Sequence, residues 1–326
     1  MPKSCEREVV PERLHNGDET AAWAKPTPPL GGVAESTPGK KFPAAEIASI
    51  VGAAPIRWAR VESGGYGRVN AHWRVEFDDG RSAFVKQALS DVAETWLRKE
   101  RVVYEHVRGS FMPTYFGALD DAGIVLLVIE DLSRADWPPP WSAERIQRVL
   151  FALEELRAAH PPTTIERLED LREKIVGWPA VNDDPEPLLS TGVCTREWLE
   201  AALPVLLQAS EDAALGGGEL LHLDVRSDNL CFADGRVVLV DWNLACAGNG
   251  EFDVAFWLPS LKLEGGPDPA EILPDAGPLA AVVAGFFAAR AGLPRPPGAP
   301  TVREFQRRQL EVALPWAARE LGLAVG

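Results

Sequence analysis

The nine residues HLDVRSDNL, from His222 to Leu230, bring two aspartates, an asparagine, a histidine and an arginine between apolar neighbours. Moving polar and charged groups out of water is costly unless each of them finds a partner. A chain that concentrates this cost in one short loop has a functional reason for doing so. We therefore interpret the stretch as the candidate active-site loop.

The segment after this loop predicts a hairpin. Two short apolar runs, CF and VVLV, flank the sequence ADGR, whose Asp234-Gly235 pair is a strong signal for a tight turn. Asn229 lies five residues before Asp234 and Asp241 lies six residues after Gly235, so both reach the open end of the hairpin. Amide and carboxylate oxygens are ligands that Mg²⁺ prefers. We expect Asn229 and Asp241 to be metal ligands and Asp224 to be a base facing the same space.

The charge of the chain is acidic and uneven. The formal net charge of −15 divides into −2 over residues 1–134 and −13 over residues 135–326. Nucleic acid is not an expected partner, because binding to phosphate backbones requires a basic surface. A cationic small molecule is compatible with this acidity, and so is an ordinary solvated acidic surface.

Cysteine usage and hydropathy predict a cytoplasmic protein. The four cysteines are scattered, without a CxxC pair or a histidine cluster, which favours neither a disulfide framework nor a zinc site and fits a reducing compartment. The first residues, MPKSCEREVV, lack the apolar run of a signal peptide. The longest apolar run, from Leu279 to Ala289, has 11 residues where a membrane span needs about 20, so we expect a buried helix and no membrane segment.

The pattern along the chain predicts an α+β fold with two lobes. Residues 1–41 mix Pro, Gly, Ser and charges without periodicity, which indicates a flexible N-terminal extension. Residues 42–134 contain the strand-like runs RWARVES, AHWRVEF, SAFVKQA and GIVLLVIEDL and should form a small antiparallel-sheet lobe. Residues 135–326 read as a larger, mainly helical lobe that holds the catalytic loop, the metal site and the acceptor-substrate site, with helix starts at Ser142 and Thr301.

One helix interrupts the small lobe. The sequence DVAE predicts a start at which Asp91 caps and Glu94 reaches back, and the helix should run to about Val107. Glu100 falls in the middle of its apolar stripe. A carboxylate on a buried face needs a basic partner, and Lys86 on a central strand is the nearest candidate.

These residues carry a family resemblance. HLDVRSDN followed by VVLVDW resembles the catalytic loop and metal-binding aspartate of the aminoglycoside phosphotransferase and choline kinase group, protein-kinase-like enzymes that phosphorylate small molecules. The resemblance covers roughly Ile56 to Leu263. It implies a bilobal protein-kinase-like fold and Mg²⁺-dependent transfer of the γ-phosphoryl group of ATP or GTP to a hydroxyl of a small molecule, such as an aminoglycoside-like antibiotic, a sugar, an amino alcohol or another metabolite.

The resemblance also assigns the nucleotide site. ESGGYGRVNAHWRV resembles the glycine-containing loop over the phosphates, Lys86 the phosphate-binding lysine and Glu100 its helical partner, while LLVIEDL resembles the hinge whose backbone binds the base. The nucleotide-binding residues implied are Gly64, Gly65, Tyr66, Gly67, Lys86, Glu100, Glu130, Asp131 and Leu132. GEFDVAFW similarly resembles the family segment in which Asp253 braces the catalytic loop.

Departures from the pattern leave alternatives open. The glycine loop lacks a third glycine, Leu223 replaces the arginine of typical protein kinases, and no D-F-G or A-P-E follows, which disfavours a peptide kinase. Arg226 either contacts the transferring phosphoryl group or is an exposed arginine that balances Asp228. His222 is expected to be a packed residue, since Asp224 already supplies a base. A catalytically silent nucleotide-binding protein with a regulatory role is the alternative function, although the key lysine, base and metal ligands are all present.

Overall fold

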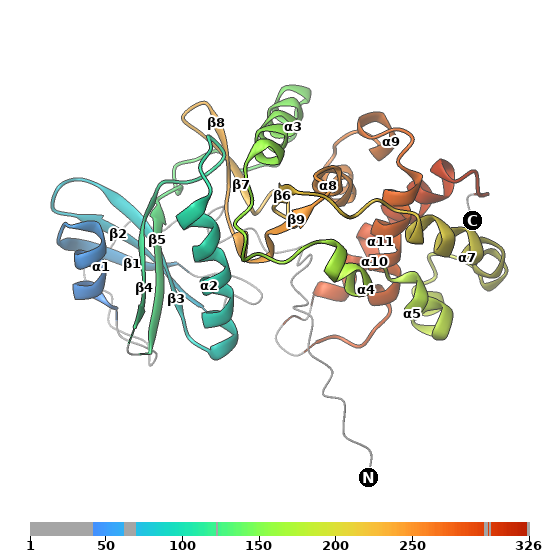
Figure 1. Ribbon diagram of the computed structural model, residues 1–326, viewed down its shortest axis with the longest axis horizontal. Coiled ribbons are helices and arrows are strands. Elements are labelled where there is room, and N and C mark those ends of the chain that lie inside the picture. Colours follow the sequence, from blue (N-terminus) through green and yellow to red (C-terminus); the bar gives the residue numbers. More distant parts are fainter. Residues whose placement is uncertain (1–41, 62–69, 122, 297–298, 300, 325–326) are drawn as a thin grey trace, which may run out of the picture.

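The computed structural model describes residues 42–61, 70–121, 123–296, 299 and 301–324, and it has two lobes that lie side by side (Figure 1). The smaller lobe is built on an antiparallel sheet, and the larger one is mainly helical. This arrangement confirms the predicted α+β fold class. The N-terminal extension over residues 1–41 lies outside the described residues.

In the described part of the chain, five strands form the sheet of the small lobe, in the order β1-β2-β3-β5-β4, and each neighbouring pair is antiparallel. A turn at Asp79-Gly80 joins the second and third strands, and Gly80 has the positive φ of 85° that such a turn favours. The strands are β1 (Pro55–Val61), β2 (Asn70–Phe77), β3 (Ser82–Ala88), β4 (Tyr115–Asp121) and β5 (Ile124–Glu130).

Helices cover both faces of this sheet (Figure 1). Helix α1 (Ala44–Val51) lies on the outer face and was not predicted from the sequence, whereas α2 (Asp91–His106) lies on the inner face, toward the large lobe, close to its predicted bounds. In the β2–β3 register, His72 faces Lys86. Because side chains alternate along a strand, Lys86 points to the inner face with α2, while Val85 joins the apolar cluster beneath α1.

The large lobe follows a connector that runs from residue 131 to residue 142. Its helices are α3 (Ala143–Ala158), α4 (Arg172–Ile175), α5 (Trp178–Asp183), α6 (Glu186–Ser190), α7 (Arg196–Glu211), α8 (Glu251–Leu263), α9 (Pro269–Ile272), α10 (Gly277–Ala291) and α11 (Val302–Glu320), with the short 3-10 turns η2 (Glu169–Leu171) and η3 (Trp242–Leu244). Ser142 caps α3 as predicted, since its hydroxyl accepts from the Arg145 amide at 3.2 Å.

Two small antiparallel pairs position the candidate site in the large lobe. Strand β6 (Glu219–Leu221) pairs with β9 (Cys246–Gly248), and β7 (Leu230–Ala233) pairs with β8 (Arg236–Leu239). The second pair is the predicted hairpin, and both residues of its Asp234-Gly235 turn have positive φ. The loop from His222 to Asn229 therefore leads from one pair directly into the other.

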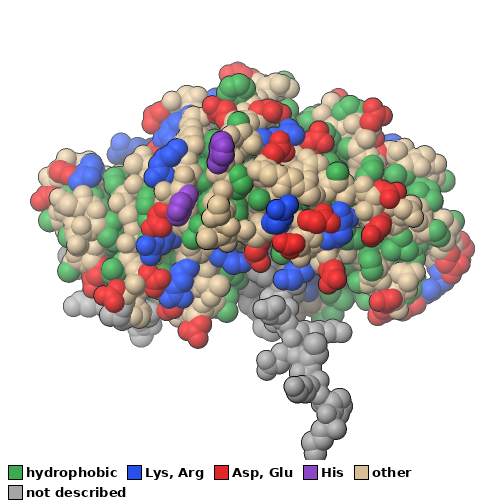
Figure 2. Space-filling model, in the orientation of Figure 1, with side chains coloured by type: hydrophobic (Ala, Val, Ile, Leu, Met, Phe, Trp, Pro, Cys, Tyr) green, Lys and Arg blue, Asp and Glu red, His purple; other side chains and the backbone are tan. Residues whose placement is uncertain are grey.

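The apolar run from Leu279 to Ala289 lies within α10, and most of its side chains are buried, as predicted. Among the described residues, no helix combines the length and the apolar character that crossing a membrane requires. On the face drawn in Figure 2, acidic and basic side chains are interspersed over both lobes.

Candidate active site

Lys86 and Glu100 form the buried ion pair that the apolar stripe of α2 predicted. The Lys86 ammonium lies 2.6 Å from Glu100 Oε1, and the Tyr104 hydroxyl donates to the same oxygen at 3.2 Å. Both partners of the pair are almost completely buried. The helix that presents Glu100 is capped by Ser90, whose hydroxyl accepts from the Ala93 amide, so the prediction of Asp91 as the cap was wrong by one residue.

Lys86 also reaches the large lobe. Its ammonium lies 3.2 Å from Asp241 Oδ1, at the open end of the β7–β8 hairpin. Burial alone would lower the pKa of Lys86, but the carboxylates of Asp241 and Glu100 hold this pKa above its usual value. Burial raises the pKa of Glu100, and Lys86 opposes that rise. The lysine is therefore a fixed positive charge between two carboxylates.

Asp241 is held in an unusual backbone conformation. Its φ of 70° and ψ of 57° lie in the left-handed region, which costs energy for any residue other than glycine, although aspartate and asparagine tolerate it best. Strained backbone of this kind persists where the surrounding structure holds it, often at functional sites. In this backbone conformation the Asp241 carboxylate contacts the Lys86 ammonium.

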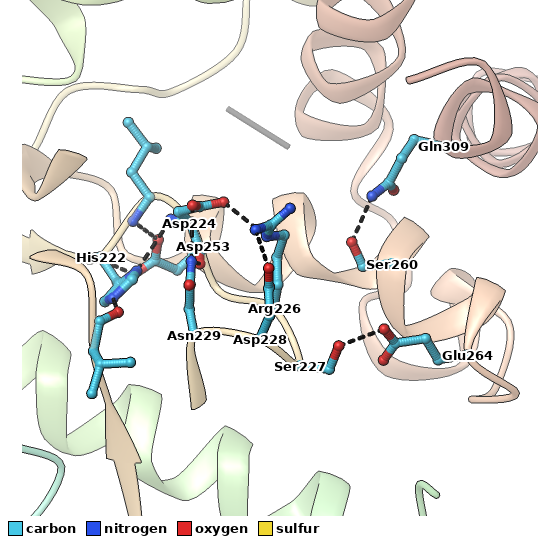
Figure 3. Close-up of polar contacts among 12 residues, drawn as sticks. His222, Asp224, Arg226, Ser227, Asp228, Asn229, Asp253, Ser260, Glu264 and Gln309 are labelled. Atoms are coloured by element: carbon cyan, nitrogen blue, oxygen red, sulfur yellow. Dashed lines mark hydrogen bonds and ion pairs between the residues drawn. The ribbon is translucent and has the colours of Figure 1, made fainter. Parts of the chain in front are cut away.

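Asp224 and Asn229, from the candidate active-site loop, contact each other directly (Figure 3). The Asn229 side-chain N–H₂ donates to Asp224 Oδ2 at 2.8 Å and to the Asp224 carbonyl at 2.9 Å. The Asn229 amide oxygen takes no part in these two bonds. The Val240 amide donates to the Asn229 carbonyl at 2.9 Å. Val240 directly precedes Asp241, so this bond ties the backbone next to Asp241 to the end of the loop.

Two buried residues brace this loop from behind. The Asp253 carboxylate accepts from the backbone amides of His222 and Leu223, both at 2.7 Å, as the resemblance implied. The His222 ring contacts the Val240 carbonyl at 2.9 Å through Nε2, and Nδ1 accepts from the Asp224 amide at 3.2 Å. Burial lowers the pKa of His222, which keeps the ring neutral, so His222 is the packed residue that we predicted.

Arg226 is buried and lies between two carboxylates, which corrects our alternative of an exposed arginine (Figure 3). Its guanidinium lies 3.3 Å from Asp224 Oδ1 and 2.5 Å from Asp228 Oδ2. Burial raises the pKa of Asp228 to about 7, although Arg226 opposes the rise. Arg226 thus balances Asp228, and it also contacts the candidate base.

The hinge residues have defined side-chain partners. The Glu130 carboxylate accepts from Arg236 at 2.6 and 2.8 Å and from the Thr114 amide at 2.8 Å. Asp131 accepts from Arg74 at 2.8 Å. Arg236 belongs to the β7–β8 hairpin, so its contact ties the hinge to the element that carries Asp241. Nothing in the sequence pattern singled out Arg236.

Asn229 and Asp241 both lie at the open end of the hairpin, and each carries an oxygen of the kind that binds Mg²⁺. Among the described residues, no three His, Cys, Asp or Glu side chains gather in a way that would hold a metal ion alone. Mg²⁺ usually takes only one or two protein carboxylates and completes its octahedron with water and phosphate oxygens. The Asn229 amide oxygen and the Asp241 carboxylate fit that smaller donor set. Gly64, Gly65, Tyr66 and Gly67, the predicted phosphate loop, lie outside the described residues.

The model of one protein family, the phosphotransferase enzyme family, matches residues 63–295. No curated protein sequence matches the chain. Among solved structures, an aminoglycoside phosphotransferase from Alicyclobacillus acidocaldarius is 14% identical, with 89% of this chain and 98% of that chain covered and a TM-score of 0.54.

Two other solved structures have the same fold. A thermostable mutant of an aminoglycoside phosphotransferase, in a ternary complex with ADP and hygromycin B, is 16% identical, with coverage of 88% and 100% and a TM-score of 0.53. A candidate fructosamine-3-kinase from Thermobifida fusca is 20% identical, with coverage of 85% and 99% and a TM-score of 0.53. At these identities the likeness shows the fold.

Proposed function

This chain belongs to the phosphotransferase enzyme family, and we propose that it transfers the γ-phosphoryl group of ATP or GTP to a hydroxyl of a small molecule. The observation that carries the proposal is the position of Lys86. Its ammonium, on the small lobe, contacts Glu100 on α2 and Asp241 beside the catalytic loop. A lysine held in this way presents a fixed positive charge to the phosphates of a nucleotide bound between the lobes.

Asp224 is the proposed base. Phosphoryl transfer depends mainly on positioning and charge neutralisation, so the base has to orient the acceptor hydroxyl and take its proton. The 2.8 Å contact from Asn229 fixes one carboxylate oxygen of Asp224, and Arg226 lies 3.3 Å from the other. These contacts hold the carboxylate in one orientation.

Asn229 and Asp241 are the proposed metal ligands. These two residues would hold Mg²⁺, which would offset the negative charge that grows on the phosphoryl group during transfer. The chain supplies the Asp241 carboxylate on a left-handed backbone and the Asn229 amide, whose N–H₂ group donates to the Asp224 carbonyl. Glu130, Asp131 and Leu132 are proposed to bind the nucleotide base through their backbone, with Gly64, Gly65, Tyr66 and Gly67 over the phosphates.

The acceptor is proposed to be a small hydroxylated molecule. One related structure contains hygromycin B, an aminoglycoside, and another is a candidate fructosamine-3-kinase, so the fold serves acceptors of different chemistry. The net charge of −15 suits a cationic acceptor without requiring one. A phosphorylation screen across aminoglycosides, sugars, amino alcohols and macrolides, read by mass spectrometry, identifies the class.

Thermal unfolding tests the nucleotide site independently of the acceptor. We expect ATP or GTP with Mg²⁺ to raise the melting temperature of the native protein, and Asp241→Asn to lose most of this rise. Asparagine tolerates the left-handed conformation of residue 241, so the variant removes ligand charge without adding backbone strain. Identical melting with and without nucleotide in the native protein would overturn the proposal.

A further inference from the structure

The Glu264 carboxylate, directly after α8, joins two segments that are far apart in the sequence. Its Oε1 accepts from the Ser227 hydroxyl at 2.5 Å, and its Oε2 accepts from the Trp141 indole N–H at 2.7 Å. Ser227 belongs to the catalytic loop, and Trp141 ends the connector between the lobes. Each carboxylate oxygen of Glu264 is therefore engaged by a donor of this chain.

The connector that presents Trp141 is itself fixed at several points. The Trp137 indole N–H donates to the carbonyl of the hinge residue Leu132 at 3.3 Å. The backbone of Asp136 exchanges two hydrogen bonds with Phe232 of β7, at 3.0 and 2.9 Å. The Trp141 ring meets the buried Trp257 ring edge-on, with centroids 5.5 Å apart. Glu264 thus receives one of its two donors from an anchored segment.

The other donor lies at the centre of the catalytic loop. Ser227 stands between Arg226 and Asp228, which are paired at 2.5 Å, and Arg226 in turn contacts Asp224 (Figure 3). A restraint on Ser227 therefore limits the backbone on both sides of it. Loss of the restraint would let Arg226 move away from Asp224, because both residues depend on the same short loop.

We propose that Glu264 is a positioning residue for phosphoryl transfer. Anchored by Trp141, it holds the catalytic loop through Ser227, so that Asp224 and Asn229 keep the geometry that the reaction needs. The expected effect of Glu264 on the reaction rate rests on the proposed function. The restraint that Glu264 places on the loop does not depend on that function. Misplacement of reacting groups by about 1 Å costs roughly a hundredfold in rate, so a loosened loop has a large kinetic effect.

Two measurements on the full chain test the proposal. Hydrogen–deuterium exchange reports the order of residues 222–229, and hydrolysis of Mg²⁺-ATP without an acceptor reports phosphoryl transfer to water. Three variants each remove one partner of the two hydrogen bonds: Ser227→Ala, Glu264→Ala and Trp141→Phe. A fourth variant, Glu264→Gln, retains one acceptor oxygen. Lys262→Ala, at an exposed position near the end of α8, is the matched control.

We expect Ser227→Ala and Glu264→Ala to increase exchange across residues 222–229 and to lower kcat about tenfold or more, with KM for ATP unchanged. Glu264→Gln should show an intermediate loss. The double variant Ser227→Ala/Glu264→Ala should be no slower than Glu264→Ala alone, because both changes remove the same link. Lys262→Ala should behave as the native protein.

Three results separate the alternatives. Unchanged exchange across residues 222–229 overturns the proposal, whatever the rates. The proposal is also overturned if Glu264→Ala hydrolyses ATP at the native rate but has a raised KM for an acceptor that the native protein phosphorylates. Glu264 would then contact the acceptor. A native protein that neither hydrolyses ATP nor phosphorylates any acceptor refutes the proposed function, while the exchange data still decide whether Glu264 holds the loop.

Discussion

The ammonium of Lys86 lies 3.2 Å from the carboxylate of Asp241, although 155 residues separate them in the chain. This contact joins the inner face of the sheet to the open end of the β7–β8 hairpin. The same ammonium contacts Glu100 at 2.6 Å, so one side chain holds together elements of both lobes. Contacts within the chain therefore hold together part of the proposed nucleotide site.

Variants of the Lys86–Glu100 pair distinguish its effect on stability from its effect on nucleotide binding. Lys86→Met removes the cationic partner of the buried Glu100 carboxylate, which keeps the Tyr104 hydroxyl as a donor, and breaking a buried pair typically costs about 3 to 5 kcal/mol. We expect a loss of this order in the free energy of unfolding, measured by urea denaturation. Lys86→Met combined with Glu100→Leu should recover much of it, because an apolar pair leaves no unpaired charge. Neither variant should bind Mg²⁺-ATP, and tight binding by the double variant would contradict our assignment of Lys86.

Asp224→Asn tests the base. Asparagine at this position keeps an oxygen that accepts from Asn229, so the loop should stay folded while the proton acceptor is lost. We expect the phosphorylation rate to fall by about 10² to 10⁴, the usual contribution of a general base. Single-turnover phosphorylation measures the rate, and melting with Mg²⁺-ATP measures nucleotide binding, which should be unchanged. Equal rates in the variant and the native protein would show that Asp224 is not the base.

Asp253 should make stability depend on pH. Burial raises the pKa of Asp253 from its usual value near 4 to about 7, although the amides of His222 and Leu223 oppose this rise. Between about pH 4 and pH 7 the folded state then holds a proton that the unfolded state has lost. The contribution of Asp253 to stability is greatest below that window and is lost as the pH rises through it.

Asp253→Asn isolates this contribution. The variant cannot titrate, so its free energy of unfolding should fall less steeply between pH 5 and pH 8 than that of the native protein. Because one of the two backbone donors then faces an N–H₂ group, we also expect the variant to be about 1 to 3 kcal/mol less stable at pH 5. Urea denaturation at each pH gives both quantities, and parallel pH profiles would contradict the assignment.

The Arg236–Glu130 contact should link the hinge to the hairpin. The guanidinium donates to both oxygens of the carboxylate, and it also donates to the Met112 carbonyl at 2.8 Å. We expect Arg236→Leu and Glu130→Gln each to lower stability, and a double-mutant cycle to give a coupling of about 1 kcal/mol. KM for ATP should rise in both variants if the hinge binds the base. Additive effects on stability would show that the contact contributes little.

Local patterns in the sequence predicted the central part of this site. The 3.6-residue periodicity placed Glu100 on a buried face, where a carboxylate needs a basic partner, and Lys86 was the nearest candidate. The Asp234-Gly235 turn placed Asn229 and Asp241 at one end of a hairpin. Both arguments concern short segments, in which periodicity and turn preferences are informative.

Other features depend on contacts that no local pattern encodes. Helix α1 has only eight residues and begins after Pro43 without a side-chain cap, so its start signal is weak. The link from Glu264 to Trp141 spans 123 residues, and the link to Ser227 spans 37. The position of Arg226 between two carboxylates follows from the fold of the loop, since its sequence neighbours also allow an exposed side chain.

Arg226 has two possible roles that kinetics can separate. In the structure its guanidinium contacts the carboxylates of Asp224 and Asp228, whereas the sequence also allowed a contact with the transferring phosphoryl group. A positive charge beside a carboxylate lowers its pKa, and the loss of that charge raises it. Removal of Arg226 should therefore raise the pKa of Asp228, which Arg226 now lowers, and loss of a phosphate contact alone does not do this.

We expect Arg226→Met to lower kcat and to move the acid limb of the kcat–pH profile to higher pH, because Asp224 and Asp228 then face each other without a shared cation. Arg226→Lys keeps a positive charge and should leave the limb near its native position, even if the rate falls through loss of the planar contact geometry. Phosphorylation rates between pH 5 and pH 9 at saturating Mg²⁺-ATP provide the measurement. A lower kcat with an unshifted limb in Arg226→Met would assign the arginine to the phosphoryl group instead of to the base.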